Sequence, residues 1–120
     1  DTDRSRGLGD VYKRQSKNCK LFYMSVNPIN STMITKAGRG ARTEAQVREF
    51  NSKIRSGLSL YYKYIDMYSV LMKKGYGTNA RYDGVDDGDD GLHYTTKTFK
   101  RIYYYCITYL NTGSINASYY

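Results

Sequence analysis

The run Leu21-Phe22-Tyr23-Met24-Ser25-Val26, followed at once by Asn27-Pro28, sets how the rest of the chain is interpreted. A short apolar run that ends in an Asn-Pro turn is typical of a buried β-strand, because proline removes a backbone donor and stops strand pairing. We therefore expect a core strand over residues 21–26. Residues 29–42 contain Gly38, Gly40 and three basic residues, which predicts an exposed loop.

An amphipathic helix is predicted next, over residues 44–56. Thr43 and Gln46 have the spacing of a capping box, in which each side chain can bond the backbone of the other residue. The apolar residues that follow recur at steps of three and four, namely Val47, Phe50, Ile54 and Leu58. This spacing places them on one face of a helix.

The sequence then predicts a second strand over residues 61–66 and two helical turns over residues 67–74. Strand, helix and strand in this order indicate a parallel βαβ crossover, so the predicted fold class is α/β. Thr95 or Thr96 can begin a last helix that ends near residues 111–113. Its expected buried face consists of Phe99, Ile102, Tyr103, Cys106 and Leu110.

Composition limits the classes of protein that need to be considered. The chain has 120 residues, 19 Lys and Arg against 11 Asp and Glu, and a formal charge of +8, which fits one domain at most. No segment approaches the roughly 20 apolar residues of a membrane span. Cys19 and Cys106 are far apart in sequence, so they support neither a disulfide scaffold nor a zinc site. We predict no metal and no cofactor.

The first fifteen residues differ from the rest. Residues 5–15, Ser-Arg-Gly-Leu-Gly-Asp-Val-Tyr-Lys-Arg-Gln, have no helical or strand periodicity, and they resemble the translation of a transposon-based adapter used in sequencing libraries. We therefore expect residues 1–15 to be a non-native tail, the alternative being a native basic one. The predicted domain covers residues 16–113, and residues 114–120 are expected to fray.

Candidate chemistry is concentrated at His93, the only histidine of the chain. Asp90 precedes it by three residues, so its carboxylate can turn back and accept a hydrogen bond from one imidazole nitrogen. That bond fixes the tautomer and leaves the other nitrogen able to take a proton from a nucleophile. The pair Asp90 and His93 is therefore a candidate for general-base catalysis.

Four segments carry a resemblance to a known family. They are Ser25-Val26-Asn27-Pro28, Ala45-Gln46-Val47-Arg48 with Phe50-Asn51, Lys63-Tyr64-Ile65-Asp66 and Asp90-Gly91-Leu92-His93-Tyr94. In this order they resemble the C-terminal part of the SGNH/GDSL hydrolase family, particularly its bacterial members. The resemblance implies a three-layer α/β/α sandwich with a flavodoxin-like parallel sheet.

The resemblance also implies an activity, the hydrolysis of esters, often of acyl groups on carbohydrates. Asp90 would orient the imidazole and His93 would be the base, with Asp89 as the nearest alternative carboxylate. The family's nucleophilic serine lies in an N-terminal Gly-Asp-Ser block, and its other oxyanion donors are a Gly and an Asn in two intermediate blocks. None of these blocks is in this sequence. We therefore expect the C-terminal part of a larger hydrolase, inactive alone.

Two other features of the sequence have alternative interpretations. Residues 79–88 form an acidic stretch that resembles an insertion into a shorter family loop, and no EF-hand register fits it, so we expect a solvated loop rather than a calcium site. The net positive charge and 15 Tyr could describe a polyanion, carbohydrate or RNA-binding module. Nucleic acid is the less favoured partner, because the tyrosines cluster at predicted strands and helices and the basic residues form no single run.

Overall fold

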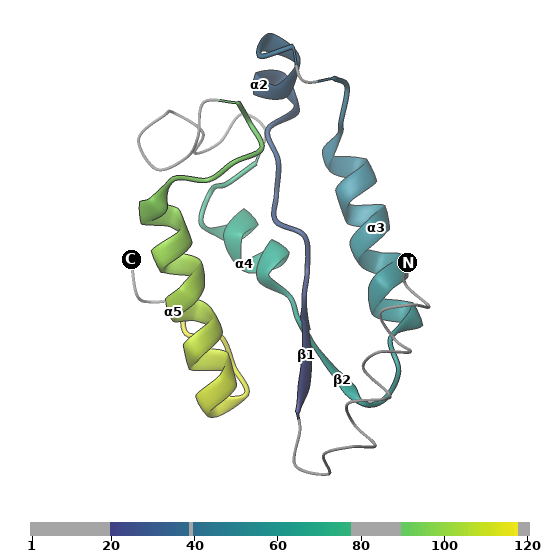
Figure 1. The fold of residues 1–120 in the computed structure, drawn as a ribbon, viewed down its shortest axis with the longest axis vertical. Helices are drawn as coiled ribbons and strands as arrows, with labels where there is room; N and C mark the ends of the chain where they lie inside the picture. Colours follow the sequence, from purple (N-terminus) through teal and green to yellow (C-terminus); the bar gives the residue numbers. More distant parts are fainter. Residues whose placement is uncertain (1–19, 39, 78–89, 118–120) are drawn as a thin grey trace.

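The structure is a computed structural model that describes residues 20–38, 40–77 and 90–117 (Figure 1). It has a mixed α/β fold. In chain order the elements are β1 (Leu21–Met24), α2 (Ser31–Lys36), α3 (Glu44–Gly57), β2 (Tyr62–Ile65), α4 (Met67–Lys73) and α5 (Thr96–Thr112). Both predicted strands are present, and each is shorter than the apolar run that indicated it.

The two strands form a parallel sheet in which Leu21 pairs with Tyr62 and Met24 with Ile65. No further strand joins this sheet within the described residues. Helix α3 lies between the strands in sequence, so the predicted parallel βαβ crossover is confirmed. Beyond the paired strands, the amide of Ser25 donates to the carbonyl of Ile65 at 3.0 Å, which extends the contact toward the carboxyl ends.

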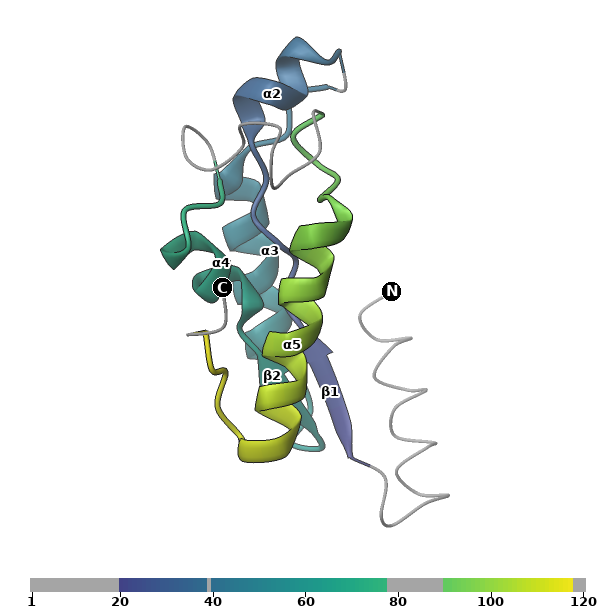
Figure 2. The same ribbon diagram turned by 90° about the vertical axis from the view of Figure 1, so that its left-hand side faces the viewer.

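Helices cover both faces of the sheet, with α5 on one side and α3 on the other (Figure 1). On the α5 side, Phe22 meets Tyr109 edge to face with ring centres 6.0 Å apart. The buried core on this side consists of Ile65, Met67, Leu71, Tyr76, Tyr94, Ile102 and Tyr105. Figure 2 shows α5 lying in front of the sheet.

Helix α3 begins with the predicted capping box. The hydroxyl oxygen of Thr43 accepts from the amide of Gln46, and the Gln46 side chain accepts from the amide of Thr43. The predicted apolar face is only partly correct. Ile54 is buried, but Phe50 is exposed and Asn51 is buried instead. Asn51 is buried because its side-chain amide bonds the backbone of Val26, as described below.

A further helix lies between β1 and α3, where the sequence predicted an exposed loop over residues 29–42. That expectation is wrong, because α2 occupies part of the stretch and Ile34 is fully buried. The side-chain oxygen of Asn30 caps α2 by accepting from the amide of Met33 at 3.1 Å. A helix of 6 residues offers too few apolar positions for a period to be recognised.

Helix α5 is present as predicted, with Thr95 as its N-cap and Gly113 closing it in the left-handed region at φ 78°. Its buried face is rotated from the predicted one. Ile102 is buried and Cys106 half-buried, but Phe99, Tyr103 and Leu110 are exposed, while Thr98, Arg101 and Tyr105 are buried. The helix is rotated because two of its polar side chains, Thr98 and Arg101, hydrogen-bond to the buried hydroxyl of Tyr76.

Some expectations fall on residues outside the described segments, namely the adapter-like residues 1–15, the acidic stretch 79–88, Asp89 and residues 118–120. After α5 the chain turns back, and Ile115 and Ala117 pack against the core. Among the helices described, none has the length and apolar character required to cross a bilayer.

Candidate active site

Asp90 and His93 are in direct contact in the segment that leads into α5. The carboxylate Oδ2 of Asp90 lies 2.5 Å from the imidazole Nδ1 of His93. The second oxygen, Oδ1, accepts from the backbone amides of Leu92 at 2.9 Å and His93 at 2.8 Å. The sequence spacing predicted this contact, and the turn that produces it is local, because one carboxylate binds three donors within the next three residues.

The two side chains differ in their contact with solvent. The Asp90 side chain is 13% exposed and that of His93 is 74% exposed. Within the described residues, the second ring nitrogen of His93, Nε2, has no hydrogen-bond partner. The pair therefore presents one accessible nitrogen to the surface while its carboxylate is held beneath.

The hydrogen bonds of the turn keep Asp90 ionised and set the tautomer of neutral His93. The His93 amide, then its imidazole and the Leu92 amide, hold the pKa of Asp90 well below its usual value, because hydrogen bonds to a carboxylate stabilise its charged form. An ionised carboxylate can only accept a hydrogen bond. In neutral His93 the proton is therefore on Nδ1, and Nε2 carries the lone pair that a general base needs.

Gly91 attaches this turn to the N-terminal cap of α2. Its carbonyl accepts from the amide of Asn30 at 3.0 Å, and its φ is 78°. A Cβ at Gly91 would lie 2.5 Å from the carbonyl oxygen of Asn30 and 2.8 Å from the amide nitrogen of Ile34. Only glycine allows the turn to approach α2 this closely.

Tyr94 attaches the other side of the turn. Its hydroxyl donates to the carbonyl of Pro28 at 2.5 Å, and its ring stacks on that of Tyr76 with centres 5.5 Å apart. Tyr76 is buried and its hydroxyl accepts from Arg101 Nη1 at 2.6 Å. The residue next to His93 is therefore connected both to the loop after β1 and to α5.

The loop after β1 is itself held from the α3 side. The amide of Val26 donates to Oδ1 of Asn51 at 2.9 Å, and the Asn51 Nδ2 donates back to the Val26 carbonyl at 3.0 Å. This pair of bonds connects the loop after β1 to α3. Next to Val26, the side-chain oxygen of Asn27 is buried and has no partner within the described residues.

Several of these supporting residues were not identified from the sequence. Gly91, Tyr94 and Asn51 belong to the segments that carry the family resemblance, but the sequence predicted no supporting role for them or for Asn30. For Gly91 the available signal was its position directly after the turn-forming aspartate. Tyr94 and Asn51 offered no such signal, because their partners lie 66 and 25 positions away in the sequence. Long-range partners of this kind cannot be derived from local patterns.

The described residues do not complete a catalytic site. No described serine, threonine or cysteine bonds to His93, and Asp89, the alternative carboxylate, lies outside the described segments. Among the described residues no group of His, Cys, Asp and Glu could hold a metal ion. What the arrangement offers chemically is an oriented proton acceptor.

No protein-family model, curated protein or solved structure matches this chain. The site is therefore interpreted from its own geometry.

Proposed function

We propose that this chain supplies the acid–base pair of a serine-type ester hydrolase of the SGNH/GDSL kind, acting on acylated carbohydrates or similar esters. The observation that carries the proposal is the arrangement of Asp90 and His93, with Oδ2 on Nδ1 and Nε2 open to solvent. In the same proposal, the described sheet and helices are the C-terminal part of a flavodoxin-like α/β/α domain. The parallel crossover and the helices on both faces agree with that fold.

The chemistry follows from the protonation of the pair. Nε2 of His93 takes the proton of a serine hydroxyl as its oxygen attacks the ester carbonyl carbon, and the imidazolium that forms is stabilised by ionised Asp90. When the bond to the leaving alcohol breaks, Nε2–H gives that proton to the alcohol. Nε2 then takes a proton from water as the water oxygen attacks the acyl carbon, and it returns that proton to the serine oxygen when the acyl–serine bond breaks.

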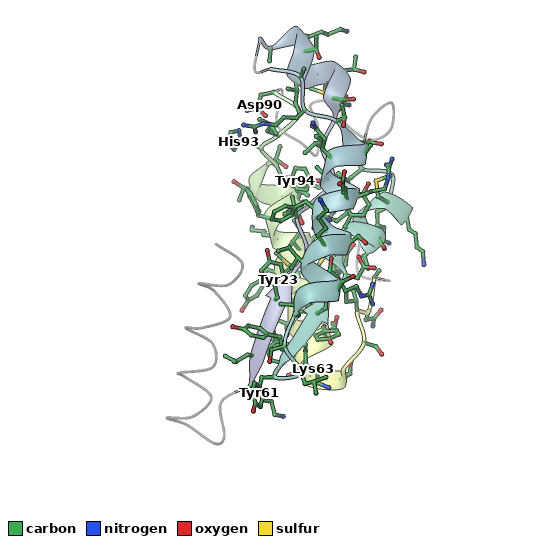
Figure 3. All side chains as sticks on the ribbon, turned by 90° about the vertical axis from the view of Figure 1, so that its right-hand side faces the viewer. Tyr23, Tyr61, Lys63, Asp90, His93 and Tyr94 are labelled. Carbon is green, nitrogen blue, oxygen red and sulfur yellow. The ribbon has the colours of Figure 1, made fainter. Side chains whose placement is uncertain are left out.

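The location of the pair suits this role. Asp90 and His93 lie at the end of the molecule toward which the strands run, beside the loop that follows β1 (Figure 3). In open α/β sheets, ligands bind outside the carboxyl ends of the strands. The bonds from Gly91 and Tyr94 to that loop keep the imidazole fixed relative to the sheet.

In this proposal the nucleophile and the oxyanion donors come from outside these 120 residues, which contain no Gly-Asp-Ser block. We therefore expect the chain alone to lack ester hydrolysis, since a base without a nucleophile cannot transfer an acyl group. In a protein that joins this chain to such a block, His93→Ala should reduce turnover of p-nitrophenyl esters at least about a thousandfold. Unchanged turnover would exclude His93 as the base.

A test on the chain itself uses its single histidine. Long-range ¹H–¹⁵N correlation spectra of the neutral imidazole should show Nδ1 protonated and Nε2 unprotonated. Asp90→Asn should reduce the population of this tautomer, because the charged acceptor is lost. The matched control is Asp66→Asn, which changes a carboxylate that also accepts from an amide three residues later and should leave the His93 signals in place.

The alternative of a Tyr-rich binding module receives less support from the structure. Tyr68, Tyr76, Tyr94 and Tyr105 are buried, so these rings serve packing rather than contact with bases. Binding to nucleic acid would fall steeply with added salt. A strong, salt-dependent affinity for single-stranded RNA, unaffected by Asp90→Asn, would favour that alternative.

A further inference from the structure

A second surface lies at the opposite end of the molecule from Asp90 and His93. Tyr61 and Lys63 mark this end, which lies at the bottom of Figure 3. A groove of about 620 Å³ opens here between the starts of the two strands and the end of α5. Its lining includes Phe22, Leu60, Tyr61 and Leu110, with Lys20 and Lys63.

Several apolar side chains at this groove are exposed to solvent. Leu60 is 101% exposed, Tyr61 54% and Leu110 50%. Single exposed apolar residues are ordinary, but several gathered on one groove indicate a contact surface. Leu60 has the largest exposure of them, and its side chain contributes nothing to the core.

The turn that carries Leu60 is held by its own hydrogen bonds. The hydroxyl oxygen of Ser59 accepts from the amide of Tyr61 at 3.1 Å. The backbone carbonyl of Ser59 accepts from the amide of Tyr62 at 3.1 Å. Leu60 is therefore presented outward by an ordered turn, and little conformational entropy is lost when it is buried.

The charge at this groove has one sign. Lys20 and Lys63 line it and are exposed, and none of the described lining residues is acidic. Neither lysine side chain makes an ion pair with a described residue. Apolar side chains with an aromatic residue and lysines beside them match the interface of a bilayer, where acyl chains meet anionic headgroups.

We propose that this surface, defined by Leu60, Tyr61, Leu110, Lys20 and Lys63, binds peripherally to anionic membranes. Leu60 and Leu110 enter the boundary between headgroups and acyl chains, and the lysines contact the headgroup phosphates. Binding in this orientation leaves Asp90 and His93 on the side away from the bilayer (Figure 3). The proposal does not depend on the hydrolase function, because it uses none of the same residues.

The test is co-sedimentation of the chain with sucrose-loaded vesicles. Vesicles made of equal parts of phosphatidylcholine and phosphatidylglycerol should bind the chain, and vesicles of phosphatidylcholine alone should bind it much more weakly. Binding should also fall in molar salt, where the screening length is about 3 Å. Equal binding to both vesicles, or none to either, would overturn the proposal.

Two variants locate the contact. Leu60→Ser should weaken partitioning about tenfold, the low end of what a buried leucine contributes, and Lys63→Gln about fivefold, as expected for one lysine at an anionic surface. Phe50→Ser and Lys53→Gln are the matched controls, since both residues are exposed on α3 and do not line this groove. Equal losses in the controls would show that the binding is not specific to this surface.

A second copy of the chain or a protein partner is the other possible occupant. Sedimentation velocity of the chain without lipid shows whether a second copy binds, because a dimer sediments faster than a monomer. A dimer that Leu60→Ser dissociates, together with no vesicle binding by the parent chain, would assign the surface to self-association and overturn the membrane proposal. A monomer that binds anionic vesicles supports it.

Discussion

The two ends of the sheet use their side chains in opposite ways. At the carboxyl end, Gly91 and Tyr94 are bonded to the loop after β1, and Asn51 bonds that loop from α3. At the amino end, Leu60 extends fully into solvent and Lys63 has no ion-pair partner among the described residues. Hydrogen bonds hold the carboxyl end in place, whereas the side chains of Leu60 and Lys63 at the amino end make no contact within the described residues that stabilises the fold.

This contrast separates the residues that hold the candidate site from the residues of the proposed membrane-binding surface. Substitutions at the carboxyl end should change the free energy of unfolding, because buried polar groups lose their partners there. Substitutions at the amino end should leave folding unchanged and affect only binding.

The largest effect is expected for Gly91→Ala. The added Cβ would overlap backbone atoms of Asn30 and Ile34, and alanine disfavours a φ of 78°. We expect a loss of about 3 kcal/mol in the free energy of unfolding measured in urea, or the loss of a cooperative transition.

Gly113→Ala is the control for this change. Gly113 has the same φ, but nothing lies within 4 Å of the position of its Cβ. We expect a loss of only about 1 kcal/mol there, the cost of the backbone conformation alone. Equal losses at the two positions would mean that the close approach of the turn to α2 is not essential.

Asn51→Ala should have the next largest effect. It removes both bonds to the backbone of Val26, and we expect a loss of about 2 kcal/mol because a part-buried amide and carbonyl lose their partners. Ser52→Ala changes an exposed neighbour on the same helix and should be nearly neutral. Similar urea midpoints for the two variants would show that the loop after β1 does not depend on α3.

Tyr94→Phe tests the attachment next to His93. It removes the hydrogen bond to the carbonyl of Pro28, while the stacking on Tyr76 remains. We expect a loss of about 1 kcal/mol and altered NMR signals of His93. Tyr61→Phe, at the other end, should change neither quantity.

The acid dependence of stability should be reduced by Asp90→Asn. The pKa of Asp90 is lowered in the folded state by the amide and imidazole of His93, so its contribution is fully present above the unfolded pKa of about 3.9. It is lost as the pH falls below that value, because the unfolded chain then binds a proton that the folded chain does not. Urea midpoints between neutral pH and pH 3 should therefore fall less in the variant. Equal slopes would contradict the lowered pKa.

The smallest effect on folding is expected for Leu60→Ser. A fully exposed side chain contributes no buried area, so the free energy of unfolding should change by less than about 0.5 kcal/mol. A larger loss would show that Leu60 packs against part of the chain, and the contrast between the two ends would then be weaker than described.

What could be predicted from the sequence was what local patterns encode. The capping box at Thr43 and the contact of Asp90 with His93 involve residues three positions apart, and both are present. The face of α5 could not be predicted, because burial of Thr98 and Arg101 depends on the hydroxyl of Tyr76, more than 20 positions earlier. Hydrophobic periodicity places apolar residues inside, and it fails where a buried polar side chain finds a distant partner.

For the same reason the candidate site was only partly predictable. The sequence identified the pair Asp90 and His93 but not how Asn30 and Pro28 hold the turn. It also predicted a loop where α2 forms. The backbone of α2 is what makes glycine necessary at position 91, so that requirement could not be predicted either. The chemistry is local in sequence, and its orientation relative to the sheet is not.

The bond from Tyr94 to Pro28 joins residues 66 positions apart, and this separation has a consequence for the order of folding. The turn between Asp90 and His93 closes over three residues, whereas the attachment must close a long loop whose entropy is lost before any contact forms. The carboxylate and imidazole should therefore meet early in folding, and the turn should reach its final position only after β1 is in place. Native-state hydrogen exchange of this segment should accordingly report on the docking of the turn rather than on the formation of the pair.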